Sequence, residues 1–285
     1  MPTLTVARPR RSALYMPAAN ARAIEKAREL PCDVVILDLE DAVAPEAKGL
    51  AREQAAAAVR AGGFGRREVV IRINGLDTPW GLEDLAAAID ARPDAILVPK
   101  VSSAHDVRAY GAAEAGGVPL WAMVETCASL FALAEIAGAE GLAALVVGTN
   151  DLAKEMRCRL TVGRAALAGP LSLIVAAGRA HGLAVLDGVF NEIEDDAGLA
   201  AQCAQGLEFG FDGKTLIHPR QVEAANAAFS PSAEEVAWSR VVVAAFDSPE
   251  NAAKGVLKVE GRMVERLHLA QARRVIAVAE AIAAA

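Results

Sequence analysis

Residues 34–61 read VVILDLEDAVAPEAKGLAREQAAAAVRA, and this stretch decides the fold because it contains one complete unit of a repeating pattern. A β-branched, apolar run at 34–39 comes first. A few acidic residues follow, and a segment rich in Ala, Glu and Arg with helical spacing completes the unit. Apolar runs with little alternation indicate strands that are covered on both faces, and the helical segments between them supply the crossovers of a parallel sheet.

The same unit recurs on both sides of this stretch, so that eight apolar runs occur in all. They lie at 13–17, 34–39, 69–74, 95–99, 120–125, 145–148, 183–187 and 211–216. Eight β/α units with no second topology between them predict an α/β fold, a TIM (β/α)8 barrel, rather than a doubly wound sheet. Length leaves this choice open, because 285 residues suit either two domains or one barrel of about 250 residues.

The repeat stops near the segment FSPS at 229–232. We therefore expect a barrel over residues 1–228 and a C-terminal helical extension over 229–285. Two helical stretches are predicted in the extension, at 233–246 and 262–284, joined by a linker at 247–261. The extension is expected to serve as a lid or an oligomerisation segment, although a plain helical cap explains the pattern equally well.

Composition excludes several classes of protein. With 54% hydrophobic and 23% charged residues the chain has ample material for a core and is not disordered. None of its apolar runs reaches the roughly 18 uncharged residues of a membrane span, and a pI near 5.3 disfavours nucleic acid as a partner. The four cysteines form no CxxC pair, and residues 1–11 lack the apolar core of a signal peptide. A cytoplasmic enzyme without a nucleic-acid or membrane partner is the expectation.

Polar residues close seven of the eight runs, and in such a barrel the chemistry lies at the carboxyl ends of the strands. They are Asp38, Glu40, Asp41, Arg72, Asn74, Lys100, Glu125, Asp151, Asp187 and His218. Carboxylates from the second, fifth, sixth and seventh runs would converge with two cations, and such a cluster is costly unless a further cation shares it. Oxygen ligands without Cys or His select a hard ion, so Mg²⁺ is the predicted cofactor.

Some of these residues have plainer interpretations. Asp151 has the residue type and position of a helix N-cap. Arg22 and Lys26 are spaced i, i+4 on the first helix, where they suit either the phosphates of a coenzyme or a solvated helix face. His218 follows the last run, and a loop histidine is often incidental. No P-loop and no GxGxxG motif occurs in the chain.

Six motifs at these strand ends resemble the citrate lyase β-subunit-like family of CoA-ester lyases, within the HpcH/HpaI aldolase superfamily. They are LDLEDAV at 37–43, RING at 72–75, ILVPK at 96–100, WAMVET at 121–126, GTNDLAKE at 148–155 and GFDGKTLIHP at 210–219. The resemblance covers nearly the whole chain and is greatest to the branch of malyl-CoA lyases and (3S)-malyl-CoA thioesterases. It implies Mg²⁺, a CoA thioester substrate, and a homo-oligomer, trimer or hexamer, in which the C-terminal segment of one subunit covers a neighbour's site.

The resemblance also implies roles for individual residues. Glu125 and Asp151 match the magnesium ligands, and Arg72 matches the group on the carboxylate or carbonyl oxygens of the acyl chain. Further matches to substrate contacts are Tyr15, Arg22, Lys26, Ile217 and His218, and supporting groups on the adjoining strand ends are Asp38, Glu40, Asp41 and Lys100. Glu265 matches the catalytic acid/base of the tail, where lyases carry Asp, and Glu260 is the alternative for that role.

The implied activity is Mg²⁺-dependent cleavage of the C–C bond of a 3-hydroxydicarboxylyl-CoA, of the malyl-CoA or citramalyl-CoA type, to acetyl-CoA and a 2-oxo acid. Arg72 and Glu265 would be its catalytic groups. Hydrolysis of (3S)-malyl-CoA to malate and CoA is the alternative. A CoA-independent pyruvate or phosphoenolpyruvate aldolase and a subunit of a larger citrate lyase complex also stay open. The acyl group, whether malyl, methylmalyl, citramalyl or citryl, is not decided by the sequence.

Overall fold

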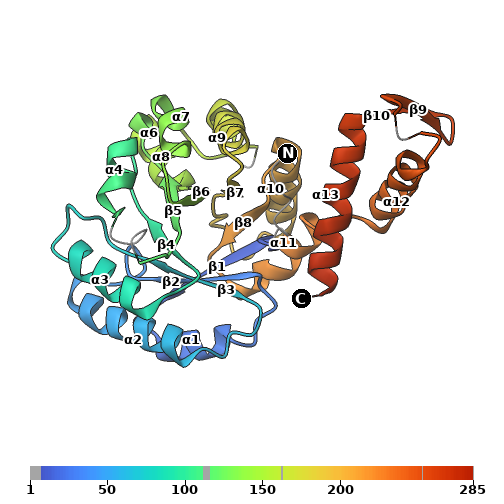
Figure 1. The fold of residues 1–285 in the computed structure, drawn as a ribbon. Helices are drawn as coiled ribbons and strands as arrows, with labels where there is room; N and C mark the ends of the chain where they lie inside the picture. Colours follow the sequence, from blue (N-terminus) through green and yellow to red (C-terminus); the bar gives the residue numbers. More distant parts are fainter. Residues whose placement is uncertain (1–7, 112–115, 162, 252, 285) are drawn as a thin grey trace. The chain divides into compact units, whose positions relative to one another are not determined.

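Eight parallel strands close a barrel in the computed structural model, which describes residues 8–111, 116–161, 163–251 and 253–284 (Figure 1). The strands are β1 Ser12–Pro17, β2 Val34–Asp38, β3 Glu68–Arg72, β4 Ala95–Val98, β5 Leu120–Val124, β6 Leu142–Val147, β7 Ala184–Asp187 and β8 Gly213–Leu216. Each pairs with the next, and β1 also pairs with β8, which closes the sheet. The expected (β/α)8 barrel is confirmed. Residues 1–7, part of the stretch expected to lack a signal peptide, lie outside the described residues.

Helices flank the barrel between its strands (Figure 1). They are α1 Ala21–Ala27, α2 Lys48–Ala61, α3 Gly81–Ala91, α4 Ala104–Ala109, α6 Cys127–Phe131, α7 Leu133–Ala137, α8 Thr149–Met156, α9 Ala168–Ala180, α10 Asp196–Phe209 and α11 Val222–Ala228, with single 3-10 turns at η1 Pro45–Ala47, η2 Ala165–Leu167 and η3 Pro219–Gln221. The Ala-rich α2 ends at Gly62, whose φ of 66° lies in the left-handed region that glycine adopts at low cost. Within the described ranges, no helix has both the length and the apolar character needed to cross a bilayer.

Side chains alternate along each strand between the barrel interior and the surrounding helices. The interior cluster contains Ala13, Val34, Ile36, Val70, Ala95, Leu97, Trp121, Met123, Ala144, Val146 and Leu186. A larger apolar cluster, which includes Leu14, Val35, Leu37, Ile71 and Val185, fills the layer between sheet and helices. Every second residue of a strand therefore points into the barrel interior, and those at the carboxyl ends of the strands lie at its mouth.

The observed strands differ from the predicted runs mainly at their ends. β6 begins at Leu142, three residues before the predicted start, and β8 begins at Gly213, two residues after it. The predicted runs at 69–74, 95–99 and 120–125 continue past the last residues of β3, β4 and β5. Their closing residues leave the ladder because they form the loops at the mouth.

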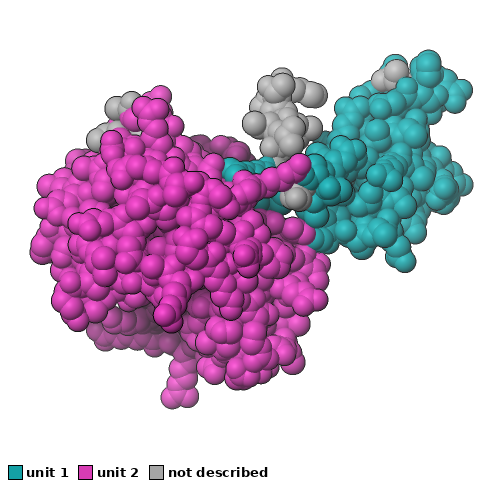
Figure 2. All heavy atoms as spheres, turned by 90° about the horizontal axis from the view of Figure 1, so that it is seen from below, with its two compact units in different colours: residues 1–9, 230–285 teal, residues 10–229 magenta. Residues whose placement is uncertain are grey.

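The residues after the barrel form a unit of their own (Figure 2). Contacts divide the described residues into a barrel unit, Arg10–Phe229, and a second unit that contains the residues from Ser230 onward. The second unit contains α12 Ala233–Asp247, β9 Val256–Val259, β10 Arg262–Glu265 and α13 Arg266–Ala283, and its small core includes Val242, Phe246, Leu257 and Val264. The lid and oligomerisation roles expected of residues 229–285 stay predictions.

The prediction of one helix over 262–284 and a plain linker over 247–261 is wrong. The linker and the first residues of that stretch form an antiparallel hairpin, with Val259 opposite Arg262, and the helix begins at Arg266. Glu260 and Gly261 make the turn, with φ of 48° and 82°. Positive φ at both central residues is what a type I′ turn requires, and this turn is one of the two-residue turns favoured in hairpins.

Candidate active site

A cavity of about 280 Å³ opens where the barrel strands end. Its walls bring together seven of the residues predicted from the sequence: Tyr15, Asp38, Asp41, Arg72, Glu125, Asp151 and Ile217. They come from β1, β2, β3, α8 and the segments that follow β2, β5 and β8. This volume is at the lower end of the range for small-ligand pockets, so it suits the acyl part of a thioester rather than a whole coenzyme.

Glu125 and Asp151 share one cation at this mouth, the ammonium group of Lys100. Lys100 Nζ lies 3.0 Å from Asp151 Oδ2 and 3.8 Å from Glu125 Oε1. The Lys100 backbone N–H also donates to Glu125 Oε1 at 2.8 Å. Glu125 is only 2% exposed, and its burial raises the pKa of its carboxyl even though the Lys100 charge acts in the opposite direction.

Gly148 allows the Glu125 carboxylate to approach the start of α8. A β-carbon at Gly148 would lie 2.3 Å from Glu125 Oε2, so only glycine leaves room. Gly148 also occupies the N-cap position of α8, and Asp151 is the third residue of the helix. The interpretation of Asp151 as a helix N-cap is therefore wrong, and its side chain contacts Lys100 instead.

The donor set at the mouth fits a divalent hard cation. Within the described ranges, no three His, Cys, Asp or Glu side chains are grouped so that they could enclose a metal ion by themselves. Two carboxylates, one of them buried, are nevertheless what Mg²⁺ commonly takes from a protein, because it keeps several waters and accepts further oxygens from substrate. The absence of a β-carbon at Gly148 lets the Glu125 carboxylate pack directly against the segment that leads to Asp151. Glu125 and Asp151 are thus the residues that could hold Mg²⁺.

Arg72 is bound by three carboxylates. Its Nε and Nη2 atoms donate to the two oxygens of Asp38 at 2.7 and 2.6 Å. Its Nη1 atom lies 2.7 Å from Glu40 Oε2 and 3.3 Å from Asp41 Oδ2. Burial alone would lower the pKa of Arg72, but Asp38 and its other neighbours hold it well above its ordinary value. Three carboxylates around one guanidinium leave this wall negative, so an anionic acyl group needs a further cation to bind here.

Glu40 lies behind Arg72, outside the cavity lining. Its Oε2 atom is buried and, among the described residues, accepts no hydrogen bond despite its short ion-pair contact with Arg72. Burial raises the pKa of Glu40 to about 7, against the lowering effect of Arg72. A carboxyl group with this pKa is populated in both protonation states at neutral pH, and it can therefore take up or release a proton beside the cavity.

Tyr15 and Met123 cover the open face of Arg72. The Tyr15 ring centroid lies 4.7 Å from the guanidinium carbon of Arg72, and the Met123 sulfur lies 3.7 Å from Arg72 Nη1. Burial raises the pKa of Tyr15, so this phenol stays protonated at neutral pH. These contacts hold the Arg72 guanidinium in place at the cavity wall.

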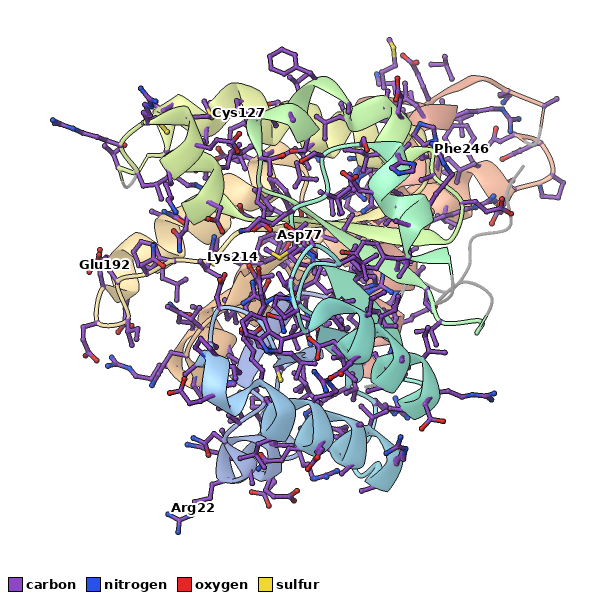
Figure 3. All side chains as sticks on the ribbon, turned by 90° about the vertical axis from the view of Figure 1, so that its left-hand side faces the viewer. Arg22, Asp77, Cys127, Glu192, Lys214 and Phe246 are labelled. Carbon is purple, nitrogen blue, oxygen red and sulfur yellow. The ribbon has the colours of Figure 1, made fainter. Side chains whose placement is uncertain are left out.

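Three predicted substrate-binding residues do not line the cavity. Arg22 and Lys26 are exposed on α1, and Figure 3 shows Arg22 extending away from the ribbon. His218 Nδ1 accepts the backbone N–H of Arg220 at 3.2 Å, so this side chain caps η3. The placement of Arg22 and Lys26 is that of a solvated helix face, and contact with a CoA moiety outside the cavity stays a prediction for them.

The carboxylate of the seventh strand is not at the mouth. Asp187 follows Leu186, an interior residue, so the alternation along the strand turns Asp187 toward the helices. There it is fully buried between Arg164 Nη1 at 2.7 Å and Lys214 Nζ at 2.9 Å. The expectation that this carboxylate joins the cluster is wrong. Asn74 likewise leaves the cavity wall, and its amide donates to Asp84 Oδ2 at 2.6 Å.

Both candidate acids of the tail belong to the second unit. Glu265 is the last residue of β10, is exposed, and donates its backbone N–H to His268 Nδ1 at 2.9 Å. Glu260 is exposed in the hairpin turn. The acid/base role expected of Glu265, with Glu260 as the alternative, stays a prediction.

Eight residues of the cavity wall were not predicted as site residues: Ala42, Met123, Val147, Gly148, Thr149, Asn150, Val189 and Thr215. Met123 precedes Glu125 by two residues and therefore shares its face of β5, a signal that the sequence carries. Thr149 and Asn150 stand between Gly148 and Asp151, within the GTNDLAKE motif. Val189 carries no comparable signal, because it follows the polar end of its strand.

The barrel and its cavity correspond to a known family. A model of the HpcH/HpaI aldolase/citrate lyase family matches residues 11–219, which make up most of the chain. The chain belongs to this family. The resemblance predicted from the six motifs is thereby confirmed, and it places the chain among enzymes of the CoA-ester lyase type.

Members of the HpcH/HpaI aldolase/citrate lyase family resemble the chain over nearly its whole length. A (3S)-malyl-CoA thioesterase of Cereibacter sphaeroides is 49% identical over 278 residues, 98% of this chain and 97% of the relative. An L-malyl-CoA/beta-methylmalyl-CoA lyase of the same organism is 34% identical over 308 residues, with the same coverage of both chains. The solved structure of CitE from Mycobacterium tuberculosis, in complex with magnesium, acetoacetate and coenzyme A, is 30% identical with a TM-score of 0.79, over 96% of this chain and 98% of that one.

Proposed function

We propose that this chain hydrolyses the thioester of (3S)-malyl-CoA, releasing malate and CoA, with Mg²⁺ held by Glu125 and Asp151 at the barrel mouth. The observation that carries the proposal is the cavity lined by these two carboxylates and by Arg72. The 49% identity to a (3S)-malyl-CoA thioesterase over nearly the full length of both chains supports the substrate and the reaction. The magnesium and coenzyme A bound by the CitE structure support the cofactor and the thioester class.

Each residue of the cavity has a defined task in this proposal. When bound, Mg²⁺ supplies a Lewis acid that polarises the reacting oxygens and neutralises charge. Arg72 presents its guanidinium, already oriented by Asp38, to the anionic oxygens of the acyl chain. Tyr15 and Met123 cover one face of the Arg72 guanidinium and shield it from water. Glu40, whose pKa burial raises to about 7, pairs with Arg72 from outside the cavity lining and can hold or release a proton there.

The C-terminal segment has a separate task. We propose that the chain forms a homo-oligomer in which this segment covers the mouth of a neighbouring copy and supplies Glu265 as acid/base. Two facts about the segment support this: it forms a unit of its own, and Glu265 is exposed on it. Arg22 and Lys26 are proposed to contact the phosphates of the CoA moiety, because both are cationic, exposed and one helical turn apart.

Cleavage of the C–C bond of malyl-CoA to acetyl-CoA and glyoxylate is the second candidate. The 34% identity to an L-malyl-CoA/beta-methylmalyl-CoA lyase favours it. The cavity would serve that reaction with the same groups: Glu125 and Asp151 would hold the cation that stabilises the oxygens of the 3-hydroxy acid, and Arg72 would neutralise developing negative charge. The two reactions differ in which bond breaks and therefore in their products.

Product identification tests the proposal. The purified chain is incubated with (3S)-malyl-CoA and Mg²⁺, and malate, glyoxylate, free CoA and acetyl-CoA are quantified together. We expect malate and CoA in equal amounts without glyoxylate. Glyoxylate with acetyl-CoA would establish the lyase in place of the hydrolase. If the chain left malyl-CoA unchanged but turned over a free 2-oxo acid, both the hydrolase and the lyase proposals would be overturned. Activity that appeared only when the chain was part of a larger complex would also overturn both.

A further inference from the structure

Lys100 has an unusual position between the two proposed metal ligands. It follows β4 with a φ of 53°, in the left-handed region that residues with a β-carbon rarely adopt. From there one residue contacts both carboxylates: its backbone N–H donates to Glu125 Oε1 at 2.8 Å, and its Nζ lies 3.0 Å from Asp151 Oδ2. A strained backbone that holds a cation against two anions points to a function for that cation.

The Lys100 ammonium neutralises the pair as a metal ion would, but it is not locked in place. Its side chain is 51% exposed, while the Glu125 side chain is 1% exposed and that of Asp151 34%. Four flexible methylenes allow the ammonium to move into solvent while the backbone N–H keeps its hold on Glu125. Lys100 can therefore leave the carboxylates without any change in the barrel.

We propose that Lys100 is an internal cation that competes with Mg²⁺ for Glu125 and Asp151 and thereby sets the metal affinity of the site. This inference rests on the metal assignment made under the proposed function. In the absence of metal the ammonium holds the two carboxylates together. Mg²⁺ must displace it or bind beside its positive charge, and either event weakens metal binding.

The size of the effect follows from the distances. A unit charge within about 4 Å of a ligand oxygen interacts strongly with a divalent ion at that oxygen, even with an effective dielectric constant of about 20. The half-exposed position of Lys100 and dissolved salt reduce this interaction. We therefore expect the removal of the charge to tighten Mg²⁺ binding by roughly tenfold at low salt, and by less as salt is added.

Isothermal titration calorimetry with Mg²⁺ alone, without substrate, tests the proposal on the full chain. Lys100→Met keeps the length of the side chain and its β-carbon but removes the charge, and it should lower the Kd for Mg²⁺ roughly tenfold. Lys100→Arg keeps the charge and should leave the Kd close to that of the wild type. Lys258→Met is the matched control, because Lys258 is exposed on β9 in the second unit, which contains neither carboxylate. Its Kd should not change.

Thermal unfolding supplies a second readout. Without metal, Lys100→Met should melt below the wild type because Glu125 and Asp151 lose their shared cation, and saturating Mg²⁺ should raise its Tm by more than it raises that of the wild type. An unchanged or weakened Mg²⁺ affinity in Lys100→Met would overturn the proposal while leaving the metal site intact. A wild-type chain that binds no Mg²⁺ would instead overturn the metal assignment, and this inference with it.

Discussion

Glu125→Gln should lower kcat for malyl-CoA by about 10³-fold, because it removes one of the two carboxylates that hold Mg²⁺ and with it several kcal/mol of charge stabilisation. Glutamine has the same shape as glutamate, and its carbonyl oxygen can still accept the Lys100 backbone N–H. The barrel should therefore stay folded. Steady-state release of CoA at saturating Mg²⁺, together with a melting curve, measures both consequences.

The control for this prediction removes a carboxylate elsewhere. Glu135 is exposed on α7, and Glu135→Gln changes the net charge by the same amount without touching the cavity. It should retain wild-type activity. If Glu125→Gln kept more than a tenth of the wild-type rate, the assignment of Glu125 as a metal ligand would have to be abandoned.

Arg72→Lys should lower kcat/KM for malyl-CoA by about 10²-fold despite the conserved charge. Lysine lacks the planar fork that meets Asp38 through two parallel hydrogen bonds, so a single ammonium group cannot keep that pairing and also contact the substrate. The buried Asp38 carboxylate would also lose part of its hydrogen bonding, which should cost about 1–3 kcal/mol of stability. Initial rates over a range of malyl-CoA concentrations and a denaturant titration test the two parts separately.

Arg60→Lys is the matched control for Arg72→Lys. Arg60 is exposed on α2 and pairs with the exposed Asp90, so the same chemical change should be silent there. A loss of stability in Arg72→Lys with undiminished kcat/KM would mean that Arg72 only holds Asp38, Glu40 and Asp41 together and does not meet the substrate.

Much of the barrel could be predicted because its strands are short apolar runs that recur with a helical segment between them. Asp38, Arg72 and Glu125 each stand an even number of residues from an interior apolar residue of their strand, and all three reach the cavity. Asp187 is also a carboxylate at a strand end, but it stands one residue from the interior residue Leu186, so its side chain points toward the helices. There it forms an ion pair with Lys214. Position at a strand end alone therefore did not separate site residues from buried structural charges.

Other features depend on contacts between residues distant in the sequence. The three carboxylates on Arg72 and the raised pKa of Glu40 arise from the way neighbouring strand ends are packed together. The hairpin of the second unit was missed because its turn uses Glu260 and Gly261 rather than the usual Asn-Gly or Asp-Gly pair. The geometry of Lys100 between Glu125 and Asp151 likewise follows from a backbone conformation that no motif announces.

The measurement that tests the central claim most directly is the rate of CoA release from (3S)-malyl-CoA by the wild-type chain in EDTA, followed by restoration of Mg²⁺ in excess. The claim is that the two carboxylates of this mouth act through a divalent cation. It predicts a rate close to background in EDTA, full recovery with Mg²⁺, and no recovery in Glu125→Gln at any Mg²⁺ concentration. An undiminished rate in EDTA would contradict it.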